Sequence, residues 1–566
     1  MDSFPLLSTI AYLPLIGALA ILFAPKASST MPRMAALVAS LASFALSLVM
    51  LFSFERNAEF QFVENLVWLE DLGVSYLMGV DGIAVLLITL TTLLSVIAIV
   101  WSWDTVSDRA REYYIAMLLL ETGMLGVFMA LDLFVFYIFW EIMLIPMALL
   151  IGIWGSTDRV YAAVKFFLYT LFGSLLMLLA IVAVYQSYFN ETGIRTLNVI
   201  ELQGGTYSST FQFWVFAAFF IAFAVKVPMF PFHTWLPDAH VQAPTAASVI
   251  LAAVMLKMGG YGLLRFNLPL FPEGTDAWGV TIIVLSIIGV LYGAFVALVQ
   301  PDMKKLIAYS SVSHMGFVTL GIFVMNIQGM NGAMMVMLAH GFNTGGLFLL
   351  VGVIYERAHT RSISAFGGLA SRMPAWSAYF AIFMFASIGL PGLSGFVGEF
   401  LVALGAWEYN RWAAAFTFAV VIFAAWYMMW MFQRVVFGRA SGQLPDHGDA
   451  QLTDDERAEL AQHSGHNAHA EHGTYETGDQ GHLEPRPVSG GDHDHALNDT
   501  SGESFPTHEG QVDSSKWPDL TRKESLTLFP LAVLTIVFGV YPAPLINIVE
   551  PSLQAILEGA TRVLGN

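Results

Sequence analysis

The sequence predicts an all-α, polytopic membrane protein: a transmembrane helix bundle of about fourteen spans. The chain of 566 residues is 56% hydrophobic and only 12% charged, about half the charged fraction of a typical soluble domain. Its mean hydropathy is +0.65. Apolar stretches of roughly 20 residues, the length that crosses a bilayer, recur along most of the chain and are separated by glycine, proline and charged residues.

These stretches place the predicted helices in order. Their approximate limits are 5–24, 31–54, 80–103, 112–130, 132–154, 160–187, 212–230, 244–266, 276–299, 303–325, 330–355, 374–407, 412–437 and 526–548. No small-residue cleavage pattern follows the first stretch, so we interpret it as a retained helix. Short loops after odd-numbered spans hold twelve Lys and Arg residues, and those after even-numbered spans hold four. This bias predicts that both termini lie outside and that the odd-numbered loops are cytoplasmic.

Residues 441–520 differ from the rest of the chain. Their 17 acidic and 3 basic residues account for −14 of the formal charge of −18, and they include nine of the fourteen histidines. Such a composition buries too little surface to offset chain entropy, so we predict a disordered cytoplasmic segment. Its regularly spaced histidines leave two interpretations open. One is a solvated low-complexity loop, which the composition favours, and the other is a weak transition-metal site at His463, His466, His469 and His472.

The residue types and motifs that are missing limit the chemistry of this chain. It has no cysteine, which excludes disulfides, thiolate zinc sites and cysteine-ligated iron–sulfur clusters. It also lacks a G-x-G-x-x-G turn and a G-x-x-x-x-G-K-[ST] loop, so it offers no dinucleotide or ATP site. We therefore expect no cofactor and no nucleic acid on this chain, and any redox chemistry in partner subunits.

Six of the ionisable residues inside predicted spans stand out, because a charge in the bilayer costs about 2.5–3.5 kcal/mol or more. They are Glu141, Lys226, Lys257, His314, His340 and Glu399. Buried Lys and Glu side chains change their proton affinity readily, and histidine titrates near neutral pH, so this set is suited to holding and passing protons. Taken alone, His314 is equally well explained as a hydrogen-bonded packing residue.

Four other charged residues carry weaker expectations. Glu121 is a further candidate for the buried set. Lys165 lies near the end of its span, where a lysine side chain reaches the lipid headgroups. Asp132 and Asp302 fall near span ends, where they cap or mark helices.

Two spans contain clusters of helix-breaking residues beside an ionisable group. Span seven runs into VPMFPFHTWLPDAHVQAP, and span twelve contains SIGLPGLSGFVGEF. Breaks at membrane depth occur where the backbone lines a protected or hydrated cavity. Because the breaks are five spans apart, we predict two inverted five-helix repeats. The predicted regions are 1–111, 112–266 (first repeat), 267–440 (second repeat), 441–520 and 521–566.

Four strings in these spans point to a known family. FWEIMLIPM, KVPMFPFHTWLPDAHVQAPTAASVILAAVMLKMGGYGLLRF, KKLIAYSSVSHMGF and GLPGLSGFVGEF resemble the antiporter-like, proton-translocating subunits of respiratory complex I, the NADH–quinone oxidoreductase. The likeness covers about residues 1–440 and 520–566. It implies a multi-pass subunit of the bacterial inner membrane that couples quinone reduction to proton pumping. NADH, FMN, iron–sulfur clusters and quinone would belong to partners, and two neighbouring antiporter-like chains would adjoin it in the lipid bilayer.

The resemblance also implies a role for each buried residue. Glu141 and Lys226 would form a charge pair in the first half-channel, Lys257 the central relay, His314 and His340 the bridge, and Glu399 the terminal group. In sister chains and antiporters the residue matching Glu399 is typically lysine, so a glutamate favours the chain M branch. The alternative function is a subunit of a multi-subunit Na+/H+ antiporter, which shares the fold. The segment 441–520 departs from the family pattern, and we assign it no role.

Overall fold

The computed structural model describes residues 4–23, 30–438, 514 and 517–564. The first half comprises α1 (Leu6–Leu22), α2 (Thr30–Ser53), β1 (Gln61–Leu69), β2 (Val74–Val80), α3 (Gly82–Thr105), α4 (Ala110–Met129), α5 (Leu133–Ile142), α6 (Leu144–Trp154), α7 (Arg159–Thr192), α8 (Val199–Leu202), α9 (Ser209–Lys226), α10 (Trp235–Gln242), α11 (Thr245–Ile250), α12 (Leu256–Gly262) and α13 (Leu268–Leu270). The second half comprises α14 (Pro272–Leu298), α15 (Met303–Phe323), α16 (Ile327–Ala358), α17 (Leu369–Arg372), α18 (Pro374–Ser387), α19 (Ser394–Tyr409), α20 (Arg411–Phe432), α22 (Arg522–Val540) and α23 (Ala543–Leu564).

The predicted membrane bundle is confirmed. Within the described residues, twelve helices are long and apolar enough to cross a membrane. To these the structure adds the shorter apolar helix α1 and the pair α18 and α19, which divide one predicted span between them. The total number of spans, the inverted repeat and the division into regions stay predictions. The segment 441–520 lies almost entirely outside the described residues.

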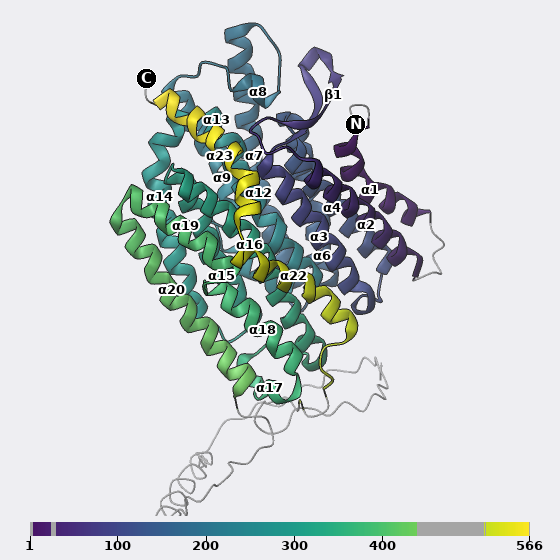
Figure 1. Ribbon diagram of the computed structural model, residues 1–566. Coiled ribbons are helices and arrows are strands. Elements are labelled where there is room, and N and C mark those ends of the chain that lie inside the picture. Colours follow the sequence, from purple (N-terminus) through teal and green to yellow (C-terminus); the bar gives the residue numbers. More distant parts are fainter. Residues whose placement is uncertain (1–3, 24–29, 439–513, 515–516, 565–566) are drawn as a thin grey trace, which may run out of the picture.

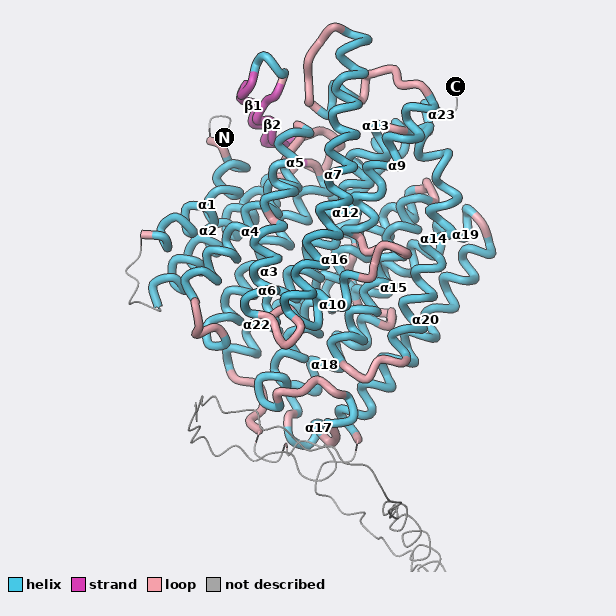
Figure 2. The backbone as a smooth tube through the Cα atoms, turned by 180° about the vertical axis from the view of Figure 1, so that it is seen from behind, coloured by secondary structure: helices cyan, strands magenta, loops and turns pink. Residues whose placement is uncertain are grey.

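The bundle has two distinct ends. Figures 1 and 2 show the β1–β2 hairpin and both ends of the chain together, and α17 at the opposite side. We call the first the hairpin end and the second the loop end, which also carries the turns at 106–109, 155–158 and 299–302.

Two segments differ from the sequence-based expectation. The predicted span 526–548 is wrong at its end: α22 stops at Val540 because Tyr541 precedes a proline and takes a non-helical backbone, with φ −133° and ψ 77°. A separate helix, α23, then crosses the bundle obliquely and packs on α3, α14 and α16 (Figure 1). The second unpredicted element is the antiparallel hairpin β1–β2, in which Gln61 lies opposite Val80 and Leu69 opposite Val74.

One buried carboxylate ties this hairpin to the bundle. Asp132 caps α5 by accepting hydrogen bonds from the backbone N–H of Phe134 (2.9 Å) and Val135 (3.2 Å), and it accepts a third from Ser75 of β2 (3.1 Å). Asp302 caps α15 in the same way through the N–H of Lys304. The expectation that both aspartates mark helix ends is therefore confirmed.

Both predicted helix breaks are present, and a third interrupts the predicted span 132–154. After Lys226 the chain runs irregularly to α10, and between α18 and α19 residues 388–393 are not helical. In this second break Gly389 has φ +74°, and a Cβ there would lie 2.7 Å from the carboxylate of Glu399. Glycine is thus required both for the backbone conformation and for the approach of that side chain. The third break, at Met143, directly follows the helix that carries Glu141.

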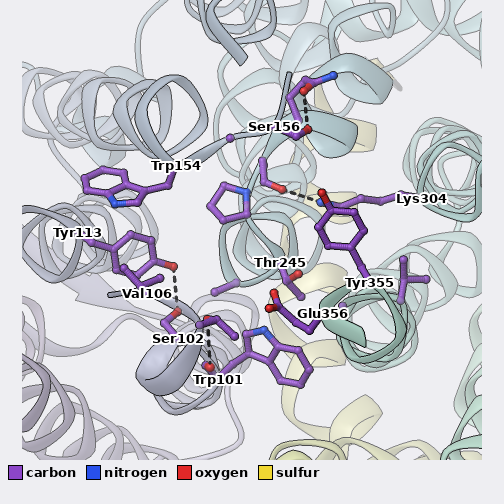
Figure 3. A pocket seen from close by; sticks show the side chains of 18 of the residues that line it. Trp101, Ser102, Val106, Tyr113, Trp154, Ser156, Thr245, Lys304, Tyr355 and Glu356 are labelled. Carbon is purple, nitrogen blue, oxygen red and sulfur yellow. Dashed lines mark hydrogen bonds between the residues drawn. The ribbon is translucent and has the colours of Figure 1, made fainter. Parts of the chain in front are cut away.

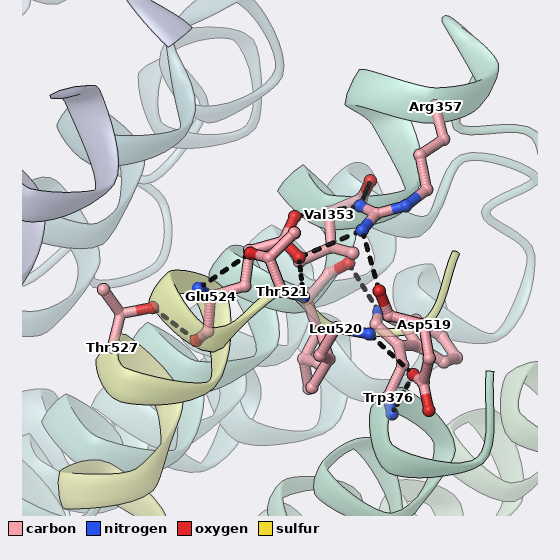
Figure 4. Close-up of polar contacts among 9 residues, drawn as sticks. Val353, Arg357, Trp376, Asp519, Leu520, Thr521, Glu524 and Thr527 are labelled. Atoms are coloured by element: carbon pink, nitrogen blue, oxygen red, sulfur yellow. Dashed lines mark hydrogen bonds and ion pairs between the residues drawn. The ribbon is translucent and has the colours of Figure 1, made fainter. Parts of the chain in front are cut away.

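The last span is anchored at the loop end by one arginine. Arg357 of α16 makes a two-pronged contact with Glu524 of α22, with Nη–Oε distances of 2.9 and 3.0 Å (Figure 4). Asp519, just before α22, accepts hydrogen bonds from the backbone N–H of Ala375 and Trp376 at the start of α18. Together these contacts hold α16, α18 and α22 in fixed positions around the second break.

Replacing Asp132 by alanine tests the hairpin anchor. Three backbone N–H groups lose their acceptor, so we expect the free energy of unfolding to fall by about 2–4 kcal/mol. The measurement is the thermal midpoint of the purified assembly, with the exposed Asp276→Ala as matched control and Asp132→Asn as the conservative variant. Equal midpoints for Asp132→Ala and Asp276→Ala would show that the carboxylate does not anchor the hairpin.

Candidate functional site

Lys257 lies at the centre of the bundle, on a stretch of helix that protein encloses completely. Its side chain is 0% exposed. The Nζ atom donates a hydrogen bond to the carbonyl oxygen of Ala252 (2.5 Å) and lies 2.8 Å from Nδ1 of His340 on α16. π-helical turns flank it at Leu251–Met255 and Leu263–Asn267, an irregularity that is frequent at functional sites. An ammonium in such a place has its charge balanced only by these few partners.

A row of titratable side chains continues from Lys257. The rings of His340 and His314, on α16 and α15, have centroids 5.8 Å apart. Nδ1 of His314 lies 3.1 Å from Oε1 of Glu399 on α19. Four of the six residues predicted from the sequence therefore meet in one row, Lys257–His340–His314–Glu399, although they come from four helices. We call this the central row.

A small polar cavity adjoins the central row. Its volume is about 10 Å³, and it is lined by His314, His340, Asn343, Ser387 and Glu399, among others. One water molecule needs about this much room. Nε2 of both histidines is buried and has no partner within the described residues. The site therefore has the space and the polar lining for one water between the imidazoles and the carboxylate.

Lys226 and Glu141 lie apart from this row and from each other. Lys226 ends α9 and is 1% exposed; its Nζ lies 5.3 Å from the ring centroid of Trp140 and 5.6 Å from that of Phe166. Both distances allow a cation–π contact. In the described part of the chain no ion pair within 4.0 Å joins Lys226 to Glu141, and Glu141 Oε1 is buried without a hydrogen bond. The carboxylate still acts electrostatically on the lysine. Their direct pairing stays a prediction.

Two buried histidines near the first break were not singled out by the sequence analysis. His240 is 0% exposed, has no hydrogen-bond partner on either ring nitrogen among the described residues, and stacks on Phe348 at 4.7 Å. It interacts electrostatically with both Lys304 and Lys257. His233 is 3% exposed, and its Nδ1 also lacks a partner in the same part of the chain. The available signal was two histidines close behind Lys226 within the proline-rich motif at the first break.

A larger cavity of about 280 Å³ opens at the loop end. In Figure 3, Tyr113 and Trp154 lie on one side of it, Lys304 and Tyr355 on the other, and Trp101 and Glu356 between them. Lys304 is 5% exposed, and its Nζ donates to the carbonyl oxygen of Ala243 (2.6 Å). Ala243 and Gln242 line the cavity and follow His240 closely in the chain. The cavity thus reaches from the loop end toward His240.

The remaining candidates lie elsewhere. Glu121 accepts a 2.5 Å hydrogen bond from Ser40 of α2 and does not contact the central row. Lys165 was expected to reach the lipid headgroups. This expectation is corrected, because its Nζ lies 2.6 Å from the carboxylate of Asp238 on α10 and pairs with it. The histidines 463, 466, 469 and 472 lie outside the described residues. Within the described residues no group of three or more His, Asp or Glu side chains is placed to hold a metal ion.

Comparison with known proteins gives the family. The family described as "NADH:quinone oxidoreductase/Mrp antiporter, TM" matches residues 130–424, a range that contains all six predicted site residues. The chain belongs to this family. NADH-quinone oxidoreductase subunit M of Rhodobacter capsulatus is 51% identical over 446 residues, which cover 76% of this chain and 86% of the relative.

Solved structures agree with this family. A chain of respiratory complex I from Thermus thermophilus with bound NADH matches with a TM-score of 0.77 and 29% identity, covering 98% of this chain and 99% of that one. A chain of the Mrp complex from Dietzia sp. matches with a TM-score of 0.72 and 23% identity, covering 98% of this chain and 51% of that one. The second likeness shows the shared fold alone.

Asn343 offers a test of how the second break is held beside the central row. Its Oδ1 accepts hydrogen bonds from Ser394 at the start of α19 (3.3 Å) and Thr535 of α22 (2.9 Å). In Asn343→Ala both hydroxyls lose their acceptor, so we expect amide hydrogen exchange in the first turn of α19 to rise about tenfold. Asn343→Asp keeps the acceptor and serves as control. Unchanged exchange in the alanine variant would exclude Asn343 as the link.

Proposed function

We propose that this chain carries protons across the membrane as the M-type subunit of an NADH–quinone oxidoreductase. Partner subunits would bind NADH, FMN, iron–sulfur clusters and quinone, and two antiporter-like chains would adjoin this one. The observation that supports the proposal best is the central row. Its four titratable groups lie one after another inside a bundle of this family. The positive-inside bias of the loops supports an orientation in which the loop end faces the cytoplasm and the bundle spans a bacterial inner membrane.

The route begins at the loop-end cavity. Protons reach Lys304 and His240 from this cavity and continue to Lys257 at the centre. From there the hydrogen bond to His340 leads sideways into the second half of the bundle, through His314 to Glu399. A histidine suits such a step because it takes up a proton on one ring nitrogen and releases one from the other. A water in the small cavity would close the gap between the two rings.

Lys226 and Glu141 regulate proton transfer along this route. Among the described residues the ammonium of Lys226 has no hydrogen-bond partner and lies near two aromatic rings, so its proton affinity depends strongly on any charge that approaches it. Glu141 lies half-buried on α5, next to Ile142 and Ile145, which are 41% and 59% exposed. A neighbouring antiporter-like chain on this face would shift the Glu141 carboxylate or its field. Quinone reduction in partner subunits would thereby be coupled to proton binding at Lys226.

A Na+/H+ antiporter subunit is the second candidate, because the family description includes Mrp antiporters. Coverage favours the first candidate: the chain aligns with 86% of the Rhodobacter subunit but with only about half of the Mrp chain. Co-purification separates the two. Flavin and iron–sulfur subunits that purify with this chain support the oxidoreductase, whereas a complex without redox cofactors supports the antiporter.

Neutralising single charges tests the proposed route. In Glu141→Gln, Lys226→Ala and Glu399→Gln we expect the rate of NADH-driven proton ejection by reconstituted vesicles to fall about tenfold or more, because each increase of about 1.4 kcal/mol in the transfer barrier slows the transfer by a factor of ten. Glu408→Gln is the matched control, since Glu408 is exposed on the same helix as Glu399. Wild-type ejection rates in all three variants would contradict the proposed route.

A further inference from the structure

The helix that carries Lys257 ends toward the hairpin end in a buried arginine. Lys257, Tyr261 and Arg265 recur every fourth residue, so they lie along one side of the helix. Their exposed fractions are 0%, 1% and 4%. A direct path from Lys257 to the hairpin end would therefore run past Tyr261 and meet the guanidinium of Arg265.

Arg265 is fixed in place from several sides. It forms an ion pair with Asp81, whose side chain is 2% exposed and also caps α3 through the N–H of Ala84. Its Nε donates to the hydroxyl of Tyr261 (3.4 Å), which in turn donates to the carbonyl of Phe128 (3.1 Å). The ring of Phe60, just before β1, lies 4.7 Å from the guanidinium carbon.

α23 covers the start of α3 beside this pair. The backbone N–H of Gly82, next to Asp81, donates to the hydroxyl of Ser552 (3.2 Å). The carbonyl of Ile548 lies so near that a Cβ on Gly82 would come within 1.9 Å of it. Both elements that the sequence did not predict, the hairpin and α23, thus meet at Asp81 and Arg265.

We infer that Arg265 is an electrostatic seal that stops protons from passing directly from Lys257 to the hairpin end. An arginine stays protonated at all accessible pH values, and a fixed positive charge is a known barrier to protons in membrane pores. The carboxylate of Asp81 offsets part of this charge, but the guanidinium has only N–H donors and no acceptor, so it cannot take up a proton and pass it on. The way through His340 carries no such charge, so protons turn sideways into the second half.

Stability alone is a weaker explanation for this pair. Burying two charges costs desolvation energy that their attraction often fails to recover, and apolar residues of similar size frequently stabilise as much. Stability does not explain why Arg265 lies on the same side of the helix as Lys257, whereas the sealing role does. The inference rests on the proposed function of Lys257 as the central relay.

The test removes the charge without leaving a partner unpaired. We expect vesicles with the complex carrying Asp81→Asn and Arg265→Gln together to lose an imposed pH gradient at least tenfold faster than wild type. Arg265→Lys keeps the charge and should stay tight. Arg195→Gln, an exposed arginine near the hairpin that donates to the Asp71 carbonyl, is the matched control. A wild-type rate of gradient loss in the double variant would overturn the seal.

Two further variants keep the test decisive. Adding Lys257→Met to the double variant should remove the leak; a leak that persists would mean that protons pass elsewhere, which overturns this inference but leaves the proposed function standing. Normal pumping in Lys257→Met alone would instead contradict the proposed function. If the double variant does not assemble, Arg265→Gln alone removes the positive charge and should lose the gradient at least tenfold faster than wild type. No leak in that variant would likewise overturn the seal.

Discussion

The hydrogen bond between Lys257 and His340 is the contact on which the rest of the site depends. An ammonium at the centre of a membrane bundle is tolerated only where polar groups surround it, and here the partners are one imidazole and one backbone carbonyl. The surrounding helices are adapted to this contact. Gly259 lets α12 approach α9, since a Cβ there would lie 2.6 Å from the carbonyl of Phe223, and Gly389 makes room for Glu399 at the far end of the row.

The helix of Lys257 has different surroundings toward the two ends of the bundle, and this difference gives the proposed route its direction. The loop end is hollowed by a cavity that reaches Lys304 and the backbone next to His240. At the hairpin end an ion pair, an aromatic ring and α23 surround the helix of Lys257. In the proposed route, a proton at Lys257 has the Arg265 guanidinium ahead of it and the His340 imidazole to the side.

Much of this arrangement could be predicted from the sequence, because a charged residue in an apolar run stands out. The six candidate residues were visible in this way. The two predicted helix breaks were visible as clusters of proline and glycine, and the bundle as a series of apolar runs. The partners were not, because His314 and Glu399 lie far apart in the chain and only tertiary packing joins them. The hairpin was missed because β1 is largely exposed and lacks the alternation of apolar and polar residues that marks a half-buried strand, and α23 because its amphipathic pattern ran on from an apolar span. His233 and His240 were hidden within a proline-rich motif that was interpreted only as a break.

The central claim is that protons cross this chain through Lys257. The most direct measurement is the number of protons ejected per NADH oxidised by vesicles that contain the Lys257→Met complex. The control is the Lys305→Met complex, because Lys305 lies at the loop end and is more exposed than Lys257. Methionine fills a similar volume but cannot hold a proton. The account predicts a lower ratio for Lys257→Met and an unchanged ratio for Lys305→Met. An unchanged ratio in both variants would contradict it.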